Sequence, residues 1–313
     1  MSRRWQKRGL LFEPRRIGDW SVTHAMLPIA EPHGEGHRLY FSARDGRGRA
    51  SIGRAHVDLA GGRVTEVEAH PLIGPGPLGA FDDSGVTTAC LVEHDGDRYL
   101  YYTGWSLGVT VPFYLFAGLA ISRDGGRTFV RASPSPILER SRIDPFLTAS
   151  PSVLVEDGRW RMWYVSGVDW IVVDAAPRHR YHIRYAESDD GIRWRPTGRV
   201  CLDFAAADEY AFGRPTVVKD GGLYRMWYCV RGDTYRLGYA ESRDGLEWER
   251  LDRQAGLDAT PGSWDAEMIA YPSIATSGGR QFLLYNGNGY GRTGIGMAEA
   301  TTVEPRPASP DPP

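Results

Sequence analysis

Side chains that can exchange a proton recur at nearly even intervals along this chain of 313 residues. They lie four to seven residues before five similar segments, which begin at positions 28, 88, 151, 215 and 272. A carboxylic acid that donates a proton and a carboxylate that acts as base or nucleophile are the pair that glycoside cleavage requires. The recurring groups are His24, Asp82, Asp83, Asp144, Asp208, Glu209, Asp265 and Glu267.

Three of these carboxylates form our candidate catalytic set. Glu209 is the candidate general acid, either Asp83 or Glu267 is the candidate base, and the third would orient the substrate or tune a pKa. A set of carboxylates can fill both roles when their surroundings push their pKa values apart. Each residue also has a simpler interpretation, because acidic residues in loops often only stabilise turns. We interpret Asp144, which precedes Pro145, as such a turn residue.

A second set of side chains could bind a small polar substrate. His24 could bond a hydroxyl group or be a structural histidine. Arg214 could pair with Glu209 or bind an anionic group, for which its planar guanidinium is suited. Asn286 and Asn288 could line a polar pocket or adopt left-handed turn conformations. The full substrate-binding set is His24, Arg44, Asp45, Asp82, Trp105, Tyr164, Trp170, Arg214, Asn286, Asn288 and Tyr290.

The segments that must position these side chains are copies of one repeat. Residues 151–164 (PSVLVEDGRWRMWY) are echoed by residues 215–228 (PTVVKDGGLYRMWY), and both are followed by Tyr-Ala-Glu-Ser and then Asp-Gly-x-x-Trp. Looser copies occupy the other three starts. Each copy reads as four short strands, and its Asp-Gly pair is typical of a tight hairpin turn. Trp163 and Trp227 recur in register, which favours a place in the core.

Repeats of this length and pattern are typical of propeller blades. We therefore predict an all-β fold, a five-bladed β-propeller whose four-stranded antiparallel blades surround a central channel. One domain would cover residues 1–302, followed by a disordered Pro-rich tail over residues 303–313. In such a fold the residues ahead of each repeat start would converge on one end of the channel.

The repeated Met-Trp-Tyr, Tyr-Ala-Glu-Ser and Asp-Gly-x-x-Trp elements resemble the five-bladed propeller superfamily of glycoside hydrolases. That superfamily includes families 43, 32, 68 and 130, and the resemblance covers roughly residues 5–300. It implies an active site at the channel mouth, with carboxylates supplied by the innermost strands of different blades. Families 43 and 32 begin their first blade with an aspartate, whereas residues 23–28 (THAMLP) contain no carboxylate. The resemblance therefore implies an atypical branch, in which His24 could bond a substrate hydroxyl or stand in for that carboxylate.

These observations predict a glycoside-processing enzyme that hydrolyses or transfers a glycosyl unit of a small sugar or glycoconjugate. Two alternatives stay open. One is a biosynthetic enzyme that uses the pocket for cyclisation, elimination or isomerisation, and the apolar stretch 109–116 could then receive an apolar substrate. The other is a non-catalytic carbohydrate-binding propeller. Residues 122–129 also resemble the Asp-box of sialidases, which is a structural turn.

Composition argues against several other classes. The 37 basic residues are spread along the chain and nearly balanced by 39 acidic ones, which is unlike a nucleic-acid-binding protein. Cys90, Cys201 and Cys229 show no paired spacing, and we find no phosphate-binding or dinucleotide-binding loop, so we expect no metal and no cofactor. No apolar run is long enough for a membrane span or a signal peptide, and the expected location is the cytoplasm.

Overall fold

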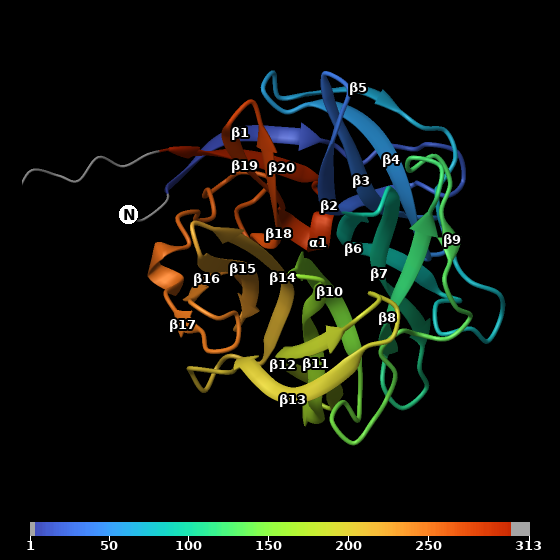
Figure 1. Ribbon diagram of the computed structural model, residues 1–313, viewed down its shortest axis with the longest axis vertical. Coiled ribbons are helices and arrows are strands. Elements are labelled where there is room, and N and C mark those ends of the chain that lie inside the picture. The colour runs from blue at the N-terminus through green and yellow to red at the C-terminus, as the bar shows by residue number, and fades with distance from the viewer. Residues whose placement is uncertain (1–3, 302–313) are drawn as a thin grey trace, which may run out of the picture.

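The computed structural model describes residues 4–301, and over these residues the protein is all-β (Figure 1). The described helical elements are short: α1 (Asn288–Gly291) and a 3-10 turn at Asp252–Gln254. The tail predicted over residues 303–313 lies outside the described residues. No helix of residues 4–301 combines the length and apolar character needed to cross a membrane.

The described strands form five antiparallel groups of four, which we number in chain order. Group 1 consists of β2 (Thr23–His33), β3 (Gly36–Arg44), β4 (Ala50–Asp58) and β5 (Arg63–Val67). Group 2 consists of β6 (Gly85–His94), β7 (Asp97–Leu107), β8 (Phe113–Ser122) and β9 (Val130–Arg131). Group 3 consists of β10 (Thr148–Glu156), β11 (Arg159–Val173), β12 (Ala176–Ser188) and β13 (Arg195–Leu202). Group 4 consists of β14 (Ala211–Asp220), β15 (Leu223–Arg231), β16 (Tyr235–Ser242) and β17 (Glu249–Arg250). Group 5 is β18 (Ala270–Ser277), β19 (Arg280–Asn286), β20 (Ile295–Thr301) and β1 (Arg4–Phe12).

Group 5 joins the two ends of the described chain, because β1 pairs with β20. The first strands of the groups lie nearest the middle of the view (Figure 1). Each contacts the next, from β2 through β6, β10 and β14 to β18, and β18 in turn contacts β2. Short parallel bridges link group 1 to group 2 and group 3 to group 4, so the hydrogen-bonded strands form one four-stranded and two eight-stranded sheets.

Aromatic side chains hold neighbouring groups together. In the turn after β12, Asp190 Oδ1 accepts backbone hydrogen bonds from Ile192 and Arg193, which brings Trp194 against Tyr101 of group 2 at 6.0 Å between ring centroids. The equivalent Trp248 meets Trp163 of group 3 at 6.1 Å. Trp163 and Trp227 are buried, as their recurrence in register predicts.

Candidate functional site

The first strand of every group is bulged at the same place, near the start of its repeat. Register shifts interrupt the pairing of β2, β6, β10, β14 and β18 there. In four of these strands the residue before the proline has a positive φ, a conformation that costs a residue other than glycine about 1–3 kcal/mol. A bulge re-aims the side chains around it. The four residues are Leu27 (φ 51°), Ser150 (48°), Arg214 (39°) and Tyr271 (57°).

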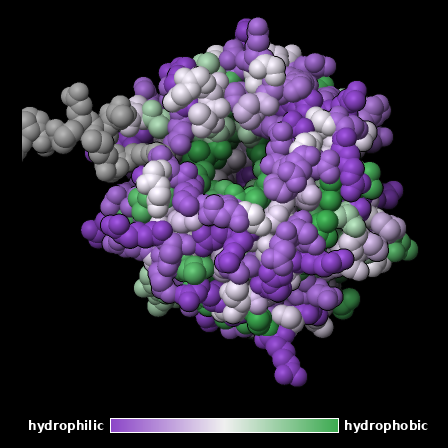
Figure 2. All heavy atoms as spheres, viewed as in Figure 1, coloured by the Kyte–Doolittle hydropathy of each residue, from purple (hydrophilic) through white to green (hydrophobic). Residues whose placement is uncertain are grey.

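A pocket of about 780 Å³ lies where these bulged strands meet, and Leu27, Ser150 and Tyr271 belong to its lining. The molecule is hollowed near its middle, with hydrophobic residues along the edge of the hollow (Figure 2). We call this cavity the aromatic–arginine pocket, and its described lining includes no aspartate or glutamate. The aromatic members are Trp105, Phe113, Tyr181, Phe212, Tyr235, Tyr271 and Tyr290, and the basic members are Arg44, Arg47, Arg49, His179 and Arg231.

His179, on β12, is packed among rings on one wall of this pocket. It stacks on Tyr181 with 4.4 Å between ring centroids and meets Trp170 edge-on at 5.7 Å. Burial and the charges of Arg231 and Arg178 lower the pKa of His179 to about 4. The imidazole is therefore neutral at pH 7, and its buried Nε2 has no hydrogen-bond partner.

Arg231, the last residue of β15, lies on the same wall. Its Nη1 donates a 2.6 Å hydrogen bond to the Oη of Tyr290, and its guanidinium lies 5.4 Å from the ring centroid of Tyr235. Its Nε is buried without a partner, and so is the Nε of Arg44 at the end of β3. No ion pair with a described carboxylate neutralises either arginine, whereas Arg49 is paired with Asp45 at 2.9 Å.

Arg44 and Arg231 occupy equivalent repeat positions, three residues after Phe41 and Tyr228 on the second strands of groups 1 and 4. Trp105 has the same position on β7 and also lines the pocket. Sequence reasoning selected Arg44 and Trp105 but missed Arg231, which the register of the repeat could have revealed. It also missed His179, Tyr181, Tyr235 and Tyr271.

Five of the predicted substrate-binding residues lie in or beside the pocket. Arg44, Trp105 and Tyr290 line it, and Trp170 packs against His179 of the lining. Asp45 lies at the turn after β3, where its carboxylate accepts hydrogen bonds from the backbone N–H groups of residues 47 and 49. Asp45 therefore holds a turn that carries pocket residues.

Asn286 and Asn288 have structural partners. Asn286 is fully buried; it accepts a hydrogen bond from the N–H of Leu27 at 2.8 Å and donates one to the carbonyl of Ala25 at 2.7 Å, which ties β19 to β2. Asn288 accepts a hydrogen bond of 2.8 Å from the N–H of Glu267. Neither amide lines the pocket.

The even recurrence of acidic residues has a structural cause. Three of them accept a hydrogen bond from the tyrosine twenty residues later, on the second strand of the same group, and all three are at most 1% exposed. The repeat thus reproduces a buried contact, and Asp82 and Tyr164, both in the predicted substrate-binding set, belong to it and do not line the pocket. The pairs are Tyr102–Asp82 (3.1 Å), Tyr164–Asp144 (2.9 Å) and Tyr285–Asp265 (3.1 Å).

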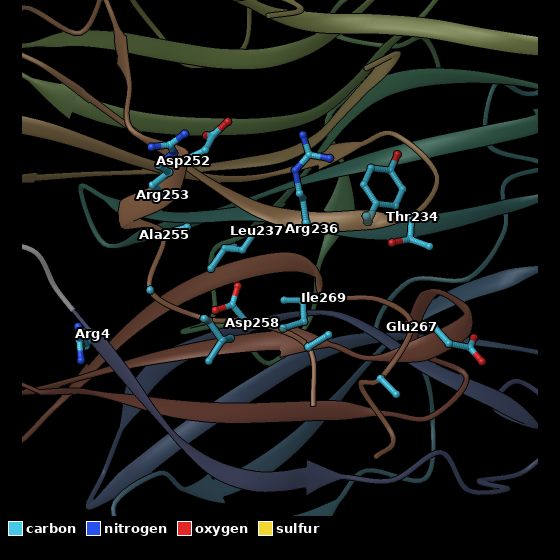
Figure 3. Close-up of a pocket in the computed structure, with 15 residues that line it drawn as sticks. Arg4, Thr234, Arg236, Leu237, Asp252, Arg253, Ala255, Asp258, Glu267 and Ile269 are labelled. Atoms are coloured by element: carbon cyan, nitrogen blue, oxygen red, sulfur yellow. The ribbon is translucent and has the colours of Figure 1, made fainter. Parts of the chain in front are cut away.

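The three candidate catalytic carboxylates line no common pocket. Asp83 accepts hydrogen bonds from the N–H of Gly79 (3.1 Å) and the hydroxyl of Ser84 (3.0 Å) within a turn. Glu267 is exposed and lines a separate cavity of about 680 Å³ beside β16 (Figure 3). Glu209 lines a third cavity. Joint catalysis by these residues stays a prediction, and their placement does not support it.

Glu209 is held between two arginines. Its carboxylate lies 3.0 Å from Arg236 and 2.9 Å from Arg250, and its side chain is 3% exposed. Burial acts to raise its pKa, but the hydrogen bonds and charges of these arginines prevail and the pKa is lowered. A general acid at neutral pH needs a raised pKa, so this arrangement favours a structural carboxylate.

Arg214 does not pair with Glu209. It is 1% exposed and donates hydrogen bonds to the carbonyls of Pro28 (2.6 Å) and Tyr271 (3.2 Å), so that it ties β14 to β2 and β18. His24 is partly buried, and burial with the charges of Arg44 and Arg292 lowers its pKa to about 4. Both side chains lie outside the described pocket lining.

Within residues 4–301, no group of three or more His, Cys, Asp or Glu side chains is arranged to hold a metal ion. The three cysteines are free thiols. The chemical character of the pocket is therefore set by its arginines, its neutral histidine and its phenols.

Solved structures with the same architecture are glycoside hydrolase-like propeller proteins, in agreement with the resemblance drawn from the repeats. One described as "Glycoside hydrolase" has a TM-score of 0.75 at 16% identity and covers 98% of this protein and 94% of its own length. A structure from work on "the GH130 family of mannoside phosphorylases" has a TM-score of 0.71 at 16% identity, covering 96% and 94%. "A thermostable family-43 glycoside hydrolase" has a TM-score of 0.61 at 16% identity, covering 92% and 91%.

At these identities the structural likeness shows the fold alone. No family model matches the chain. Two Mycobacterium tuberculosis proteins, "Uncharacterized protein Rv1502" and "Uncharacterized protein MT1551", are each 45% identical to it over 296 residues, which cover 94% of this chain and 98% of theirs. The chain belongs to the same family as these two mycobacterial proteins.

Proposed function

We propose that this chain is a single-domain, five-bladed β-propeller that processes or binds a glycoside in the aromatic–arginine pocket. The five antiparallel groups would be the blades, and their first strands would surround a central channel. The ring of contacts from β2 round to β18 and back to β2 supports this arrangement. The pocket would then open at one end of the channel, where the strand bulges lie.

The composition of the pocket is the observation that carries the proposal. A volume of about 780 Å³ falls in the range of small-molecule sites. Sugar rings stack on aromatic faces, which Trp105 and Tyr290 would provide. Sugar hydroxyls need hydrogen-bonding partners, and Ser150, His179 and Arg231 offer them.

Hydrolysis by two carboxylates has less support than saccharide binding. Such hydrolysis requires a carboxylic acid and a carboxylate on either side of the bond, and the described lining offers neither. His179 is neutral and could accept a proton, while Tyr290, held by Arg231, could donate one. This observation favours a second candidate function, saccharide binding or a non-hydrolytic acid–base reaction.

A panel of aryl glycosides, assayed together with calorimetric binding of the parent sugars, tests the proposal. We expect saturable binding that is lost in Trp105→Ala, with or without turnover. Release of the aryl group would establish glycoside processing, and binding without release would establish the second candidate. Binding that survives both Trp105→Ala and Tyr290→Ala would place the sugar outside this pocket and overturn the proposal.

A further inference from the structure

Two arginines of the aromatic–arginine pocket are partly buried and lack an anionic partner within the described residues, whereas Arg47, which is also unpaired, is exposed. Arg44 lies at the end of β3 and Arg231 at the end of β15, and each has a buried Nε with no hydrogen-bond partner. Other arginines of this protein are neutralised in place: Arg49 by Asp45, and Arg250 by Glu209. Buried charges in proteins are usually paired, so the two unpaired guanidiniums mark a place where negative charge is missing.

A row of tyrosines that begins at Arg231 lines the pocket to which Arg44 also belongs. Arg231 donates to Tyr290, and Tyr235 lies 6.2 Å from both Tyr290 and Tyr271 between ring centroids. Arg44 acts electrostatically on Tyr271 at the other end of this row. A ligand lying along the tyrosines would therefore have one arginine near each of its ends.

The surroundings of the pocket carry the same charge. Arg44 and Arg292 favour the neutral form of His24, and Arg178 and Arg231 favour the neutral form of His179. The described lining contains no carboxylate, so the charged side chains that line this concave site are all arginines, although the whole chain has a formal charge of −2. A cleft lined by one sign of charge concentrates ligands of the opposite sign.

We infer that the ligand of this pocket is an acidic saccharide, one that carries a phosphate or a carboxylate, and that Arg44 and Arg231 bind this group. The inference rests on the proposed function and adds to it the class of substrate. A guanidinium presents paired N–H donors that match the oxygens of either group. The stacking surface of Trp105 and the tyrosines would hold the sugar ring.

Matched pairs of sugars test this inference. Calorimetry compares glucose with glucose 6-phosphate and glucuronate, and mannose with mannose 6-phosphate, at low and at high salt. We expect the acidic members to bind at least about tenfold more tightly, as charge-assisted hydrogen bonds allow, and to lose this advantage at high salt. The phosphate and carboxylate arms identify which group the site prefers.

Variants of the two arginines test whether the tighter binding of acidic sugars arises in this pocket. Arg44→Gln and Arg231→Gln should each weaken the acidic sugars about tenfold or more and weaken the neutral ones by a clearly smaller factor, so that the advantage of the acidic sugars is lost, while Arg231→Lys should retain part of that advantage. Arg123→Gln removes the same charge at an exposed site outside the pocket and should change neither. If Arg231→Gln does not fold, Arg44→Gln and the salt dependence of binding to the wild type still decide whether the pocket prefers acidic sugars.

Two results would overturn the inference and are distinct. Equal binding of neutral and acidic sugars, lost in Trp105→Ala, would remove the acidic substrate class and leave the proposed function standing. No binding of any sugar in the panel would remove both.

Discussion

Two pairs of arginines in this protein differ in whether a carboxylate neutralises them. Arg236 and Arg250 enclose Glu209, whose carboxylate accepts hydrogen bonds from both. Arg44 and Arg231 have no such carboxylate, and each keeps a buried donor without a partner. A neutralised cluster stabilises the folded chain, whereas an unneutralised one facing a cavity is available to a ligand. Acidic residues therefore mark the structural region here, and their absence marks the candidate site.

The strongest way to break this comparison is to remove the carboxylate between the paired arginines. Glu209→Gln leaves two guanidiniums beside a nearly buried neutral side chain, and breaking a buried ion pair costs about 3 kcal/mol or more. We expect the free energy of unfolding, measured in urea, to fall by about 3 kcal/mol. The exposed Glu267→Gln is the matched control and should stay within about 0.5 kcal/mol of the wild type.

The pH dependence of stability should also report on the ion pairs between Glu209 and its two arginines. The folded-state pKa of Glu209 is lowered, so its contribution to stability is present above the unfolded value and is lost as pH falls through the folded pKa. The difference in stability between wild type and Glu209→Gln should therefore shrink as the pH falls below 4.5, the ordinary pKa of a glutamate. Unchanged stability of Glu209→Gln, accompanied by loss of ligand binding or turnover, would instead move Glu209 into the functional site.

The repeated acidic contact gives the next largest effect. Asp144 accepts hydrogen bonds from the hydroxyls of Tyr164 and Ser166 at 2.9 and 2.6 Å. Asp144→Asn can satisfy these two donors only in part, and we expect a loss of about 1–2 kcal/mol in urea unfolding. A double-mutant cycle with Tyr164→Phe should give a coupling energy of at least about 0.5 kcal/mol. Additive losses would show that the contact between Asp144 and Tyr164 contributes no coupling energy. Asp95→Asn, at an exposed side chain, serves as the control.

The fold was readable from the sequence because its repeat is set by local chemistry. Asp190 stabilises its turn through backbone bonds, and Trp194 packs on the preceding group as its place in the repeat requires. The candidate site was readable only in part. Arg44, Trp105 and Tyr290 were selected, but Asp82 and Asp144 recur because each satisfies a tyrosine hydroxyl. A buried contact and a catalytic group can show the same spacing, and only their partners distinguish them.

Arg231 was missed because its proposed role in binding a ligand depends on the absence of a carboxylate beside its guanidinium. A sequence shows that a residue is basic, but it does not show whether a carboxylate lies beside it. His179 was missed because its neutral state follows from burial and from the charges of Arg231, which comes from another strand group, and of Arg178 beside it in the chain. The register of the repeat could have pointed to Arg231 as a pocket residue, but its lack of a carboxylate partner and the environment of His179 become visible only when segments far apart in the chain are brought together around the pocket.

The pH dependence of stability also tests the neutral state of His179 in the aromatic–arginine pocket. The pKa of His179 is lowered to about 4 from an ordinary value of 6.5, so the unfolded chain binds a proton more readily. Stability is therefore complete above pH 6.5 and falls progressively as pH decreases towards 4. Between pH 7 and 5 we expect the wild type to lose about 2 kcal/mol more than His179→Gln. His70→Gln, at an exposed residue, should lose as much as the wild type, and an equal loss in His179→Gln would contradict the buried, neutral imidazole.

The smallest expected effect on stability is the one that separates the two regions most clearly. Arg44→Gln removes a charge that no described carboxylate neutralises, so folding loses no ion pair, and the unpaired buried donor disappears. We expect the free energy of unfolding to change by less than about 0.5 kcal/mol, or to rise, because groups held ready for a ligand often lower the stability of the free protein. Arg250→Gln, which leaves Glu209 with one arginine, should instead lose about 2 kcal/mol or more. Equal losses in the two variants would show that Arg44 is as much a structural residue as Arg250, and the contrast between the regions would fall.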